Sequence, residues 1–456
     1  MDPQPSHSSI EDLSDEILLK IFRNIHHECH CDYHDNDALD QHCECALRND
    51  YASLCRLQPF QRAATELLYS SIEVKHAKDM IILLRTILLH PELGTLIRKL
   101  KIKFNLDIKT VDKQDLLLFN EHVGLLHLRF TQEGQWTCHS EDPTAYGSIC
   151  AALFLIHAPD ITELTIDDTN GWVGQYIKGS LRSTWTTTFD PTAFQSVSRP
   201  TPMTHNLTTL CMQQGDYILM QMPLLFRLRS LRHVKLVNWT QLEYQTNWHW
   251  ETGEGLSSVR TLNLPDCLVH PKLVAMLVKA CKVLEEFSYS LSPYHAPGKL
   301  DLASMWTALR NHKHCIKRIE FFTYHSVSCD PLANEFLDYT SLEVLRLDTD
   351  LICSHEETLP DLSSVFPACL KKLRIDMTMA LLREDVDDPN GPLWSLIGHK
   401  DTVFPSLKCL EFGFWDQEDP WEVAVPFKNP ILLNEFRERG ITVFLCDVYS
   451  EPCFDW

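Results

Sequence analysis

The chain has 456 residues, with 41 lysines and arginines against 62 aspartates and glutamates, so its formal net charge is −21. This acidic balance argues against sequence-independent binding to nucleic acid or to an anionic membrane surface. No stretch approaches the roughly 20 apolar residues that span a bilayer. The first residues also lack the basic and apolar regions of a secretory signal peptide. We therefore expect a cytoplasmic or nuclear protein with no nucleic-acid or membrane partner.

The first predicted element is an amphipathic helix at residues 9–25, with Ser14 suited to cap its start. A stretch rich in histidine and cysteine follows at residues 24–45. Residues 51–74 have helical spacing that Pro59 divides into two short helices, followed by a strand over "SIEV". The next segment, residues 76–97, predicts an apolar helix that ends near Pro91.

A short theme then recurs along the chain: an apolar residue, two variable residues, an apolar residue, one variable residue and an apolar residue. Its copies begin at positions 97, 161, 207, 231, 259, 284, 316, 342, 370 and 407. The intervening positions are mostly polar, as a half-exposed strand requires. Helical patterns such as "PKLVAMLVKACKVL" and "LASMWTALRNH" fill several of the gaps.

The spacing of this theme predicts the fold class. From position 210 to position 373 the central apolar anchors follow at steps of 24, 28, 25, 32, 26 and 28 residues. A strand and a helix at this period are typical of a leucine-rich-repeat solenoid, an α/β fold with parallel strands on one face and helices on the other. The Asn or Cys expected three residues after the strand occurs only as Asn105 and Cys267, so we expect an irregular array.

The array is predicted to carry loop insertions and a terminal cap. Segments near residues 131–148, 167–206 and 383–405 are predicted to be loops because they are long or rich in turn-forming residues. At the end of the chain, "NPILLNEFRERGITVFLCDV" predicts a last helix, with Gly440 ending it, and a closing strand.

Two segments resemble a known family. Residues 13–22, "LSDEILLKIF", resemble the first helix of an F-box, which usually reads Leu-Pro-x-Glu-[Ile/Leu]-[Leu/Ile]-x-x-[Ile/Leu]-Phe. Ser14 stands where proline is usual, and it too can start a helix. Residues 51–74 resemble the second part of F-box proteins common in filamentous fungi, through the Leu67-Leu68-Tyr69 ending and the strand after it.

The resemblance implies a domain organisation: a disordered N-terminus at 1–9, an F-box-like helical module at 10–70 and an irregular leucine-rich-repeat domain at 71–456. Residues 26–45 are an insertion that F-boxes usually lack. They either loop away from the module or cover its docking surface.

The resemblance also implies a function. In this family the F-box binds the Skp-type adaptor of a cullin–RING ubiquitin ligase, and the repeats hold the target protein. No reaction occurs on the F-box protein itself. The implied adaptor-binding residues are Leu13, Ile17, Leu18, Ile21, Phe22, Leu54, Leu57 and Phe60. The alternative is that these residues form only the core of a helical cap on the solenoid, because an amphipathic helix buries its apolar face in either case.

The stretch at residues 24–45 raises the question of a zinc site. Its candidate ligands are Cys29, Cys31, His34, Cys43 and Cys45. Structural zinc sites usually use Cys-x2–4-Cys spacing, and here each cysteine pair is separated by one residue. Side chains at that spacing point apart in an extended chain. We therefore favour a polar loop, with zinc binding as the less favoured alternative.

For the other candidate sites we favour a structural explanation over a functional one. Trp239, Trp248 and Trp250 are either partner-binding residues or residues packed between repeats, and we favour packing. The 17 cysteines are expected to be reduced thiols. The sequence contains no Gly-rich phosphate loop, nucleophile elbow or HExxH motif. We expect no catalytic residue and no cofactor, and the target protein cannot be named. A repeat scaffold outside any ligase is the alternative function.

Overall fold

The computed structural model describes residues 60–103, 112–125, 153–154, 157–167, 206–213, 225–241, 254–291, 302–323, 336–352, 361–377, 391–414 and 430–447. The predicted first helix, the stretch at 24–45, the loop at 131–148 and most of the loop at 167–206 lie outside these residues. The described residues up to Asp167, with Asn206 and Leu207, belong to one compact unit, and those from Thr208 onward to a second.

The first unit contains three parallel strands in chain order, β1-β2-β3, with helices between them. Its elements are α3 (Gln61–Ser70), β1 (Ser71–Val74), α4 (Ala77–Leu89), α5 (Pro91–Gly94), β2 (Lys99–Lys103), α6 (Lys113–Leu125) and β3 (Glu163–Asp167). The predicted helix after Pro59, the strand at 71–74 and the helix that ends before Pro91 are all confirmed.

The second unit contains nine parallel strands in one sheet, in the order β4-β5-β7-β8-β9-β10-β11-β12-β13, with β6 beside β7. Its strands are β4 (Thr209–Gln213), β5 (His233–Val237), β6 (Thr240–Gln241), β7 (Thr261–Val269), β8 (Glu286–Leu291), β9 (Arg318–Thr323), β10 (Val344–Asp348), β11 (Lys372–Met377), β12 (Cys409–Phe414) and β13 (Thr442–Asp447).

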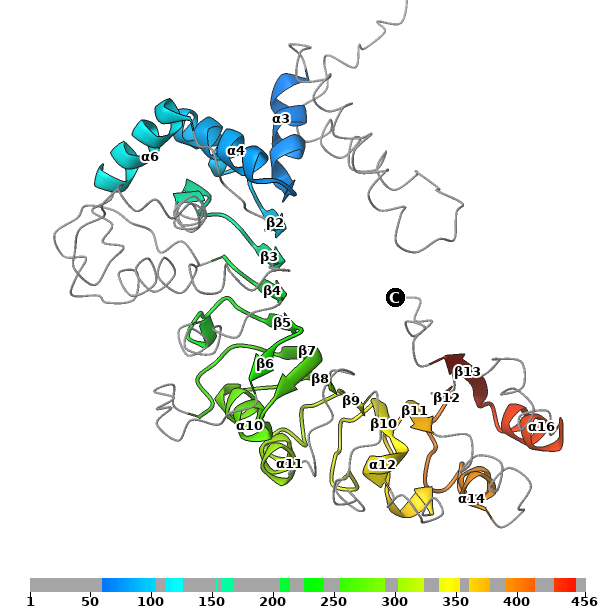
Figure 1. The fold of residues 1–456 in the computed structure, drawn as a ribbon. Coiled ribbons are helices and arrows are strands. Elements are labelled where there is room, and N and C mark those ends of the chain that lie inside the picture. Colours follow the sequence, from blue (N-terminus) through cyan, green and yellow to red (C-terminus); the bar gives the residue numbers. More distant parts are fainter. Residues whose placement is uncertain are drawn as a thin grey trace, which may run out of the picture. The chain divides into compact units, whose positions relative to one another are not determined.

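Helices connect the strands of the second unit and lie along one side of its sheet (Figure 1). They are α10 (Pro271–Ala280), α11 (Ala303–Arg310), α12 (Thr349–Ile352), the 3-10 helix η3 (Leu362–Ser364), α14 (Pro392–Gly398) and α16 (Pro430–Glu438). Because parallel neighbours need a crossover connection, this alternation of strand and helix gives a solenoid-like repeat fold. The predicted α/β class with parallel strands and helices alongside is confirmed.

All ten copies of the theme form strands, and each strand begins at the third residue of its copy. The central anchors pair in register, for example Leu345 with Ile319 on one side and Leu373 on the other. The first residue of each copy lies in the core, as Leu231, Ile316 and Leu370 illustrate, each with 0% exposure. Burial of one such side chain contributes about 1.5–3 kcal/mol.

The elements predicted for the chain end are also present. Helix α16 is followed by Gly440 at φ +70°, a left-handed conformation that favours glycine, and then by β13. The segment predicted to be a loop near 383–405 contains α14, in which Leu393, Leu396 and Ile397 are buried at helical spacing. Pro392 fits the first turn of that helix. Among the described residues, no helix is long and apolar enough to cross a membrane.

Gly94, at the end of α5, allows the backbone of α5 to approach the segment at His157. A Cβ atom at this position would lie 1.9 Å from the His157 carbonyl oxygen. That distance is far below van der Waals contact and involves backbone on both sides, so neither partner can rotate away.

We therefore expect Gly94→Ala to lower the free energy of unfolding by at least about 2 kcal/mol, as other overpacking changes do. Urea denaturation followed by circular dichroism measures it. Gly398→Ala is the matched control, because a Cβ there meets nothing within 4 Å, and it should leave stability unchanged or slightly raised. Equal stability of the two variants would contradict the close approach at Gly94.

Candidate functional site

In the sheet of the second unit, the apolar anchors of the theme point to one face. We call the opposite face the polar face. Strand pairing places one residue from each of nine strands in a single register row: Cys211, Lys235, Asn263, Ser288, Glu320, Arg346, Arg374, Glu411 and Phe444. We call these residues the central row. Eight of them occupy the variable position between the last two apolar residues of the theme, and Phe444 lies on β13, after the last copy of the theme.

The character of this face changes along the sheet. On β5, His233 and Lys235 are exposed while Val234 and Leu236 are buried, which is the ordinary alternation of a strand with one solvated face. On β10 to β12 both faces are buried. Arg346 is 5% exposed, Arg374 1% and Glu411 4%. Charged side chains are almost never this buried unless they are paired, so this part of the face needs a specific arrangement of partners.

One carboxylate joins the two buried arginines. The Nε of Arg346 donates to Oδ2 of Asp376 at 2.6 Å, and the Nε of Arg374 donates to Oδ1 of the same residue at 2.8 Å. Asp376 itself is 0% exposed. The guanidinium of Arg346 also lies over the Phe322 ring, 3.8 Å from its centroid. A buried ion pair of this kind specifies geometry more than it adds stability, because desolvation offsets much of the attraction.

Two further pairs flank this group. The Nζ of Lys372 lies 2.6 Å from Oε1 of Glu411 across β11 and β12. On β9, the Nε of Arg318 donates to Oε1 of Glu320 at 2.7 Å. Over β9 to β12 the face therefore carries three groups of paired cations and anions, contributed by four strands.

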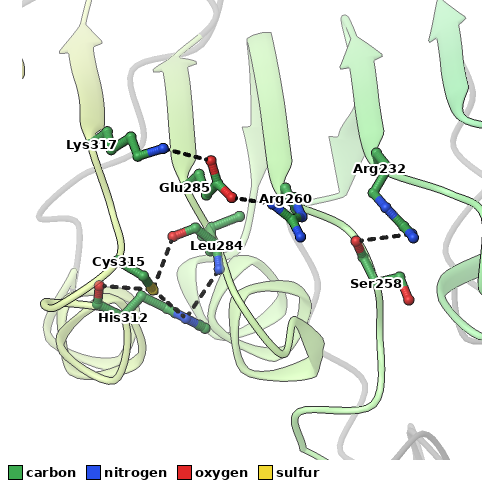
Figure 2. Close-up of polar contacts among 8 residues, drawn as sticks. All are labelled: Arg232, Ser258, Arg260, Leu284, Glu285, His312, Cys315 and Lys317. Atoms are coloured by element: carbon green, nitrogen blue, oxygen red, sulfur yellow. Dashed lines mark hydrogen bonds and ion pairs between the residues drawn. The ribbon is translucent and has the colours of Figure 1, made fainter.

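A second set of charges lies at the edge of the sheet where the strands begin (Figure 2). The Glu285 carboxylate accepts hydrogen bonds from Lys317 at 3.0 Å and from Arg260 at 2.6 Å. The hydrogen bond from Lys317 is the largest influence that lowers the pKa of Glu285, and the same contact raises the pKa of Lys317. Arg260 and Lys317 are solvent-exposed and Glu285 is half-buried, so each pair contributes little stability.

His312 connects two repeats beneath this edge (Figure 2). The backbone N–H of Leu284 donates to its Nδ1 at 3.3 Å, so the ring proton is on Nε2, which donates to the Val278 carbonyl at 3.1 Å. Burial lowers the pKa of His312. Cys315 donates to the Leu284 carbonyl at 3.4 Å. Both ring nitrogens of His312 are in structural use, which leaves neither for a metal or a substrate.

Cys267 occupies the position where leucine-rich repeats carry Asn or Cys. Its thiol donates to the Leu236 carbonyl of the preceding strand at 3.1 Å. Burial raises its pKa to about 12, so it stays a neutral thiol. Asn105 lies outside the described residues.

A serine, a histidine and an aspartate also meet near α14. The Ser395 hydroxyl donates to Asp361 at 2.8 Å and lies 3.2 Å from Nδ1 of His399. Partial burial alone would raise the pKa of Asp361, but hydrogen bonds from Ser363 and Ser395 outweigh it and hold the pKa below its ordinary value. In a hydrolytic triad the histidine lies between serine and carboxylate. Here the serine lies between the other two, so the histidine cannot take its proton.

Most of the residues singled out from the sequence lie outside the described part of the chain. These are Leu13, Ile17, Leu18, Ile21, Phe22, Leu54 and Leu57 of the adaptor-binding set, all five candidate zinc ligands, and Trp248 and Trp250. Phe60 is described: it is half-buried, and its carbonyl accepts from Ala64 at the start of α3. Trp239 is fully buried, as the packing interpretation predicted. Within the described ranges, no group of three metal-ligating side chains comes together.

The sequence interpretation did not single out Arg346, Arg374, Asp376 or Glu411. A signal was present, because consecutive copies of the theme carry a charge at the same variable position. Recognising it requires the register of the strands, which the theme alone does not specify.

No family model matches the chain, and no curated protein matches it. The polar face must therefore be interpreted from its own geometry.

The neutral state of His312 predicts a pH dependence of stability. An unfolded histidine takes up a proton near pH 6.5, whereas the folded pKa is lowered. As the pH falls below 6.5, His312 becomes protonated in the unfolded state but not in the folded state. The free energy of unfolding therefore falls with the pH until the pKa of the folded state is reached. His312→Gln should remove this part of the slope, measured by urea denaturation between pH 4 and pH 8.

His314→Gln is the matched control. It lies two residues away, and its side chain is exposed. This variant should keep the slope of the unaltered chain. If His312→Gln also keeps it, the buried neutral histidine is not the source of the pH dependence.

Proposed function

We propose that this chain is the substrate-recognition subunit of a Skp–cullin–F-box-type E3 ubiquitin ligase, in the cytoplasm or nucleus, and that it bridges the adaptor to a target protein. One observation carries the proposal: the F-box-like pattern at residues 13–22 and 51–74 is followed directly by a repeat array with a polar sheet face. The first part supplies an apolar docking helix, and the second a surface for a partner.

The repeat array is better suited to binding a partner protein than to catalysing a reaction. Parallel strands stacked in sequence order present side chains from many repeats on one face, and this is how solenoid proteins bind extended partners. On β9 to β12, charged groups of that face are engaged with one another, as in Asp376 with Arg346 and Arg374. Groups arranged in this way can recognise a complementary surface.

Under this proposal the chain accelerates ubiquitin transfer by proximity. The adaptor is held by burial of the apolar set that begins at Leu13, and the target is held by the sheet face. Tethering raises the effective concentration of target lysines near the ligase, without any covalent step on this chain.

The alternative is a repeat scaffold that binds partners outside any ligase. It shares the sheet face but not the adaptor, so the N-terminal segment distinguishes the two functions. Zinc binding through residues 26–45 is a third and less favoured function, which metal analysis of the purified chain decides.

Affinity purification with mass spectrometry tests the proposal. The unaltered chain should capture a Skp-type adaptor, and Leu13→Asp with Ile17→Asp should abolish that capture, because charges on the apolar helix face cannot be buried against the adaptor. Leu117→Asp is the matched control, since Leu117 is 70% exposed on α6, and it should capture the adaptor normally. Capture unaffected by the paired substitution, or no adaptor with the unaltered chain, would leave only the scaffold function.

A further inference from the structure

A row of charged residues lies at the edge of the sheet where the strands of the second unit begin. Its members occupy the second position of seven consecutive copies of the theme, each directly before a strand. We call them the edge row: Arg232, Arg260, Glu285, Lys317, Glu343, Lys371 and Lys408. The row contains five cations and two anions, whereas the whole chain has a net charge of −21. The edge row therefore has the opposite net charge to the chain.

Backbone hydrogen bonds hold the members of the edge row beside one another. The carbonyl of each member accepts from the N–H of the next, as the Arg232 carbonyl does from Arg260 at 2.7 Å and the Lys371 carbonyl from Lys408 at 2.8 Å. All six successive pairs are joined in this way. Neighbouring strands of a sheet lie about 4.8 Å apart, so the row is about 29 Å long.

In the middle of the row the charges alternate in sign. Glu285 contacts both Arg260 and Lys317, and the Nζ of Lys371 lies 2.9 Å from the Glu343 carboxylate. The contact with Glu285 raises the pKa of Lys317 most, and Glu343 adds to the effect. The alternation is therefore continuous over five repeats, from Arg260 to Lys371.

The two ends of the row are cations that contact no carboxylate among the described residues. Arg232 donates through Nη1 to the carbonyl oxygens of Arg229, Leu231 and Ser258, at 2.6, 3.1 and 3.4 Å, and the last contact is drawn in Figure 2. Its guanidinium is thus held in place while its Nε and Nη2 stay available. Lys408 is exposed, and its ammonium contacts no other described side chain.

The cations of the row extend further into solvent than the glutamates between them. The side chains of Arg260, Lys317 and Lys371 are each more than half exposed, against 23% for Glu285 and 43% for Glu343. A partner that approaches this edge therefore meets the cationic groups first. Because exposed ion pairs contribute little stability, exchanging one carboxylate partner for another costs little.

The local charge favours an acidic partner. The Debye length is about 10 Å at 0.1 M salt, so an approaching group responds to the row more than to distant acids of the chain. The third positions of the same seven copies contain one acid, Glu286, and two cations, Arg318 and Lys372, so they do not reverse the charge of the row.

The spacing of the cations favours carboxylates on an extended segment. A phosphate group offers several acceptor oxygens at one point and is best bound by several donors that converge there. The cations of the edge row are instead distributed one to a strand. An extended chain advances about 3.3 Å per residue, so a segment of about nine residues covers the row.

We propose that the edge row binds an acidic, extended segment of a partner polypeptide. Carboxylates of the segment contact Arg232 and Lys408 at the two ends, and they replace Glu285 and Glu343 as partners of the cations between. That the partner is a protein to be ubiquitinated rests on the proposed function, whereas binding of the acidic segment does not.

Fluorescence anisotropy of labelled peptides, added to the full chain at low salt, tests this inference. One probe consists of five Glu-Ser repeats and the second of five Gln-Ser repeats. The third has the second sequence with three phosphoserines, which give it about the charge of the first. We expect the Glu-Ser probe to bind at least about tenfold more tightly than the Gln-Ser probe, and this affinity to fall as salt screens the charges.

Variants of the row complete the test, and circular dichroism checks that each one folds. Arg232→Gln with Lys408→Gln should weaken the Glu-Ser probe about fivefold, because both unpaired cations are lost. The matched control is Lys78→Gln with Lys113→Gln, which removes the same charge from two exposed lysines of the first unit and should leave the affinity unchanged.

Removal of the acids should have the opposite effect. Glu285→Gln with Glu343→Gln frees the cations in the middle of the row and should strengthen the Glu-Ser probe about fivefold. Should Arg232→Gln prevent folding, Lys408→Gln alone, at an exposed position, should still weaken the probe about twofold.

Four results would overturn the inference. The first two are equal affinity of the Glu-Ser and Gln-Ser probes, and equal weakening by the control variant. The third is tighter binding of the phosphoserine probe than of the Glu-Ser probe, which would make phosphate the ligand. The fourth is a dimer in light scattering that Arg232→Gln with Lys408→Gln dissociates, which would place a second copy of this chain on the row.

The edge row and the ligase proposal fail in different ways. If the adaptor is captured but the Glu-Ser probe does not bind, the edge row alone is wrong. If the probe binds but no adaptor is captured, the ligase proposal is wrong and the row serves a scaffold.

Discussion

The structure of the second unit depends on one repeated backbone contact at the point where each strand begins. The carbonyl of the residue immediately before a strand accepts hydrogen bonds from two successive N–H groups of the next repeat. The Thr208 carbonyl accepts from Arg232 at 2.8 Å and His233 at 3.0 Å, and the Glu343 carbonyl accepts from Lys371 at 2.8 Å and Lys372 at 2.9 Å. This contact sets the register before any side chain is considered, and the parallel strands then continue it.

Because the register of the strands is fixed, the theme repeated along the sequence produces a sheet with one apolar face and one polar face. Because side chains alternate along a strand, each apolar position of the theme stacks on its counterpart in the core, and each variable position stacks on its counterpart in a row. A shift of one residue in a single repeat would place an arginine in the core. The packing of the apolar anchors therefore keeps the charged side chains in their register positions. The charges themselves add little net stability.

The consequence for function is that the face is built from residues far apart in the sequence. Arg346 and Asp376 are separated by 30 positions, yet their side chains meet at 2.6 Å. Such a face can change its specificity by substitution at variable positions while the anchors stay constant. This separation of core positions from surface positions is compatible with the proposed recognition of a target protein.

The strands and most of the helices could be predicted because their signals are local. The theme itself marks where each strand starts, Pro271 marks the start of a helix, and Pro91 and Gly440 mark helix ends. Helix α14 was not predicted because an acidic, turn-rich segment precedes it and the apolar pattern of the helix is short. The paired charges of the face could not be predicted, because Arg374 and Glu411 become neighbours only through a connection whose length varies from repeat to repeat.

The most direct test of this account is a double-mutant cycle between Arg346 and Asp376, measured by urea denaturation. Arg346→Met and Asp376→Asn are made singly and together, and the free energies of unfolding are compared. If the register holds these side chains in contact, their coupling should be about 1–3 kcal/mol. Additivity within about 0.5 kcal/mol would contradict the contact, and with it the row of charges on which the proposed recognition face is built.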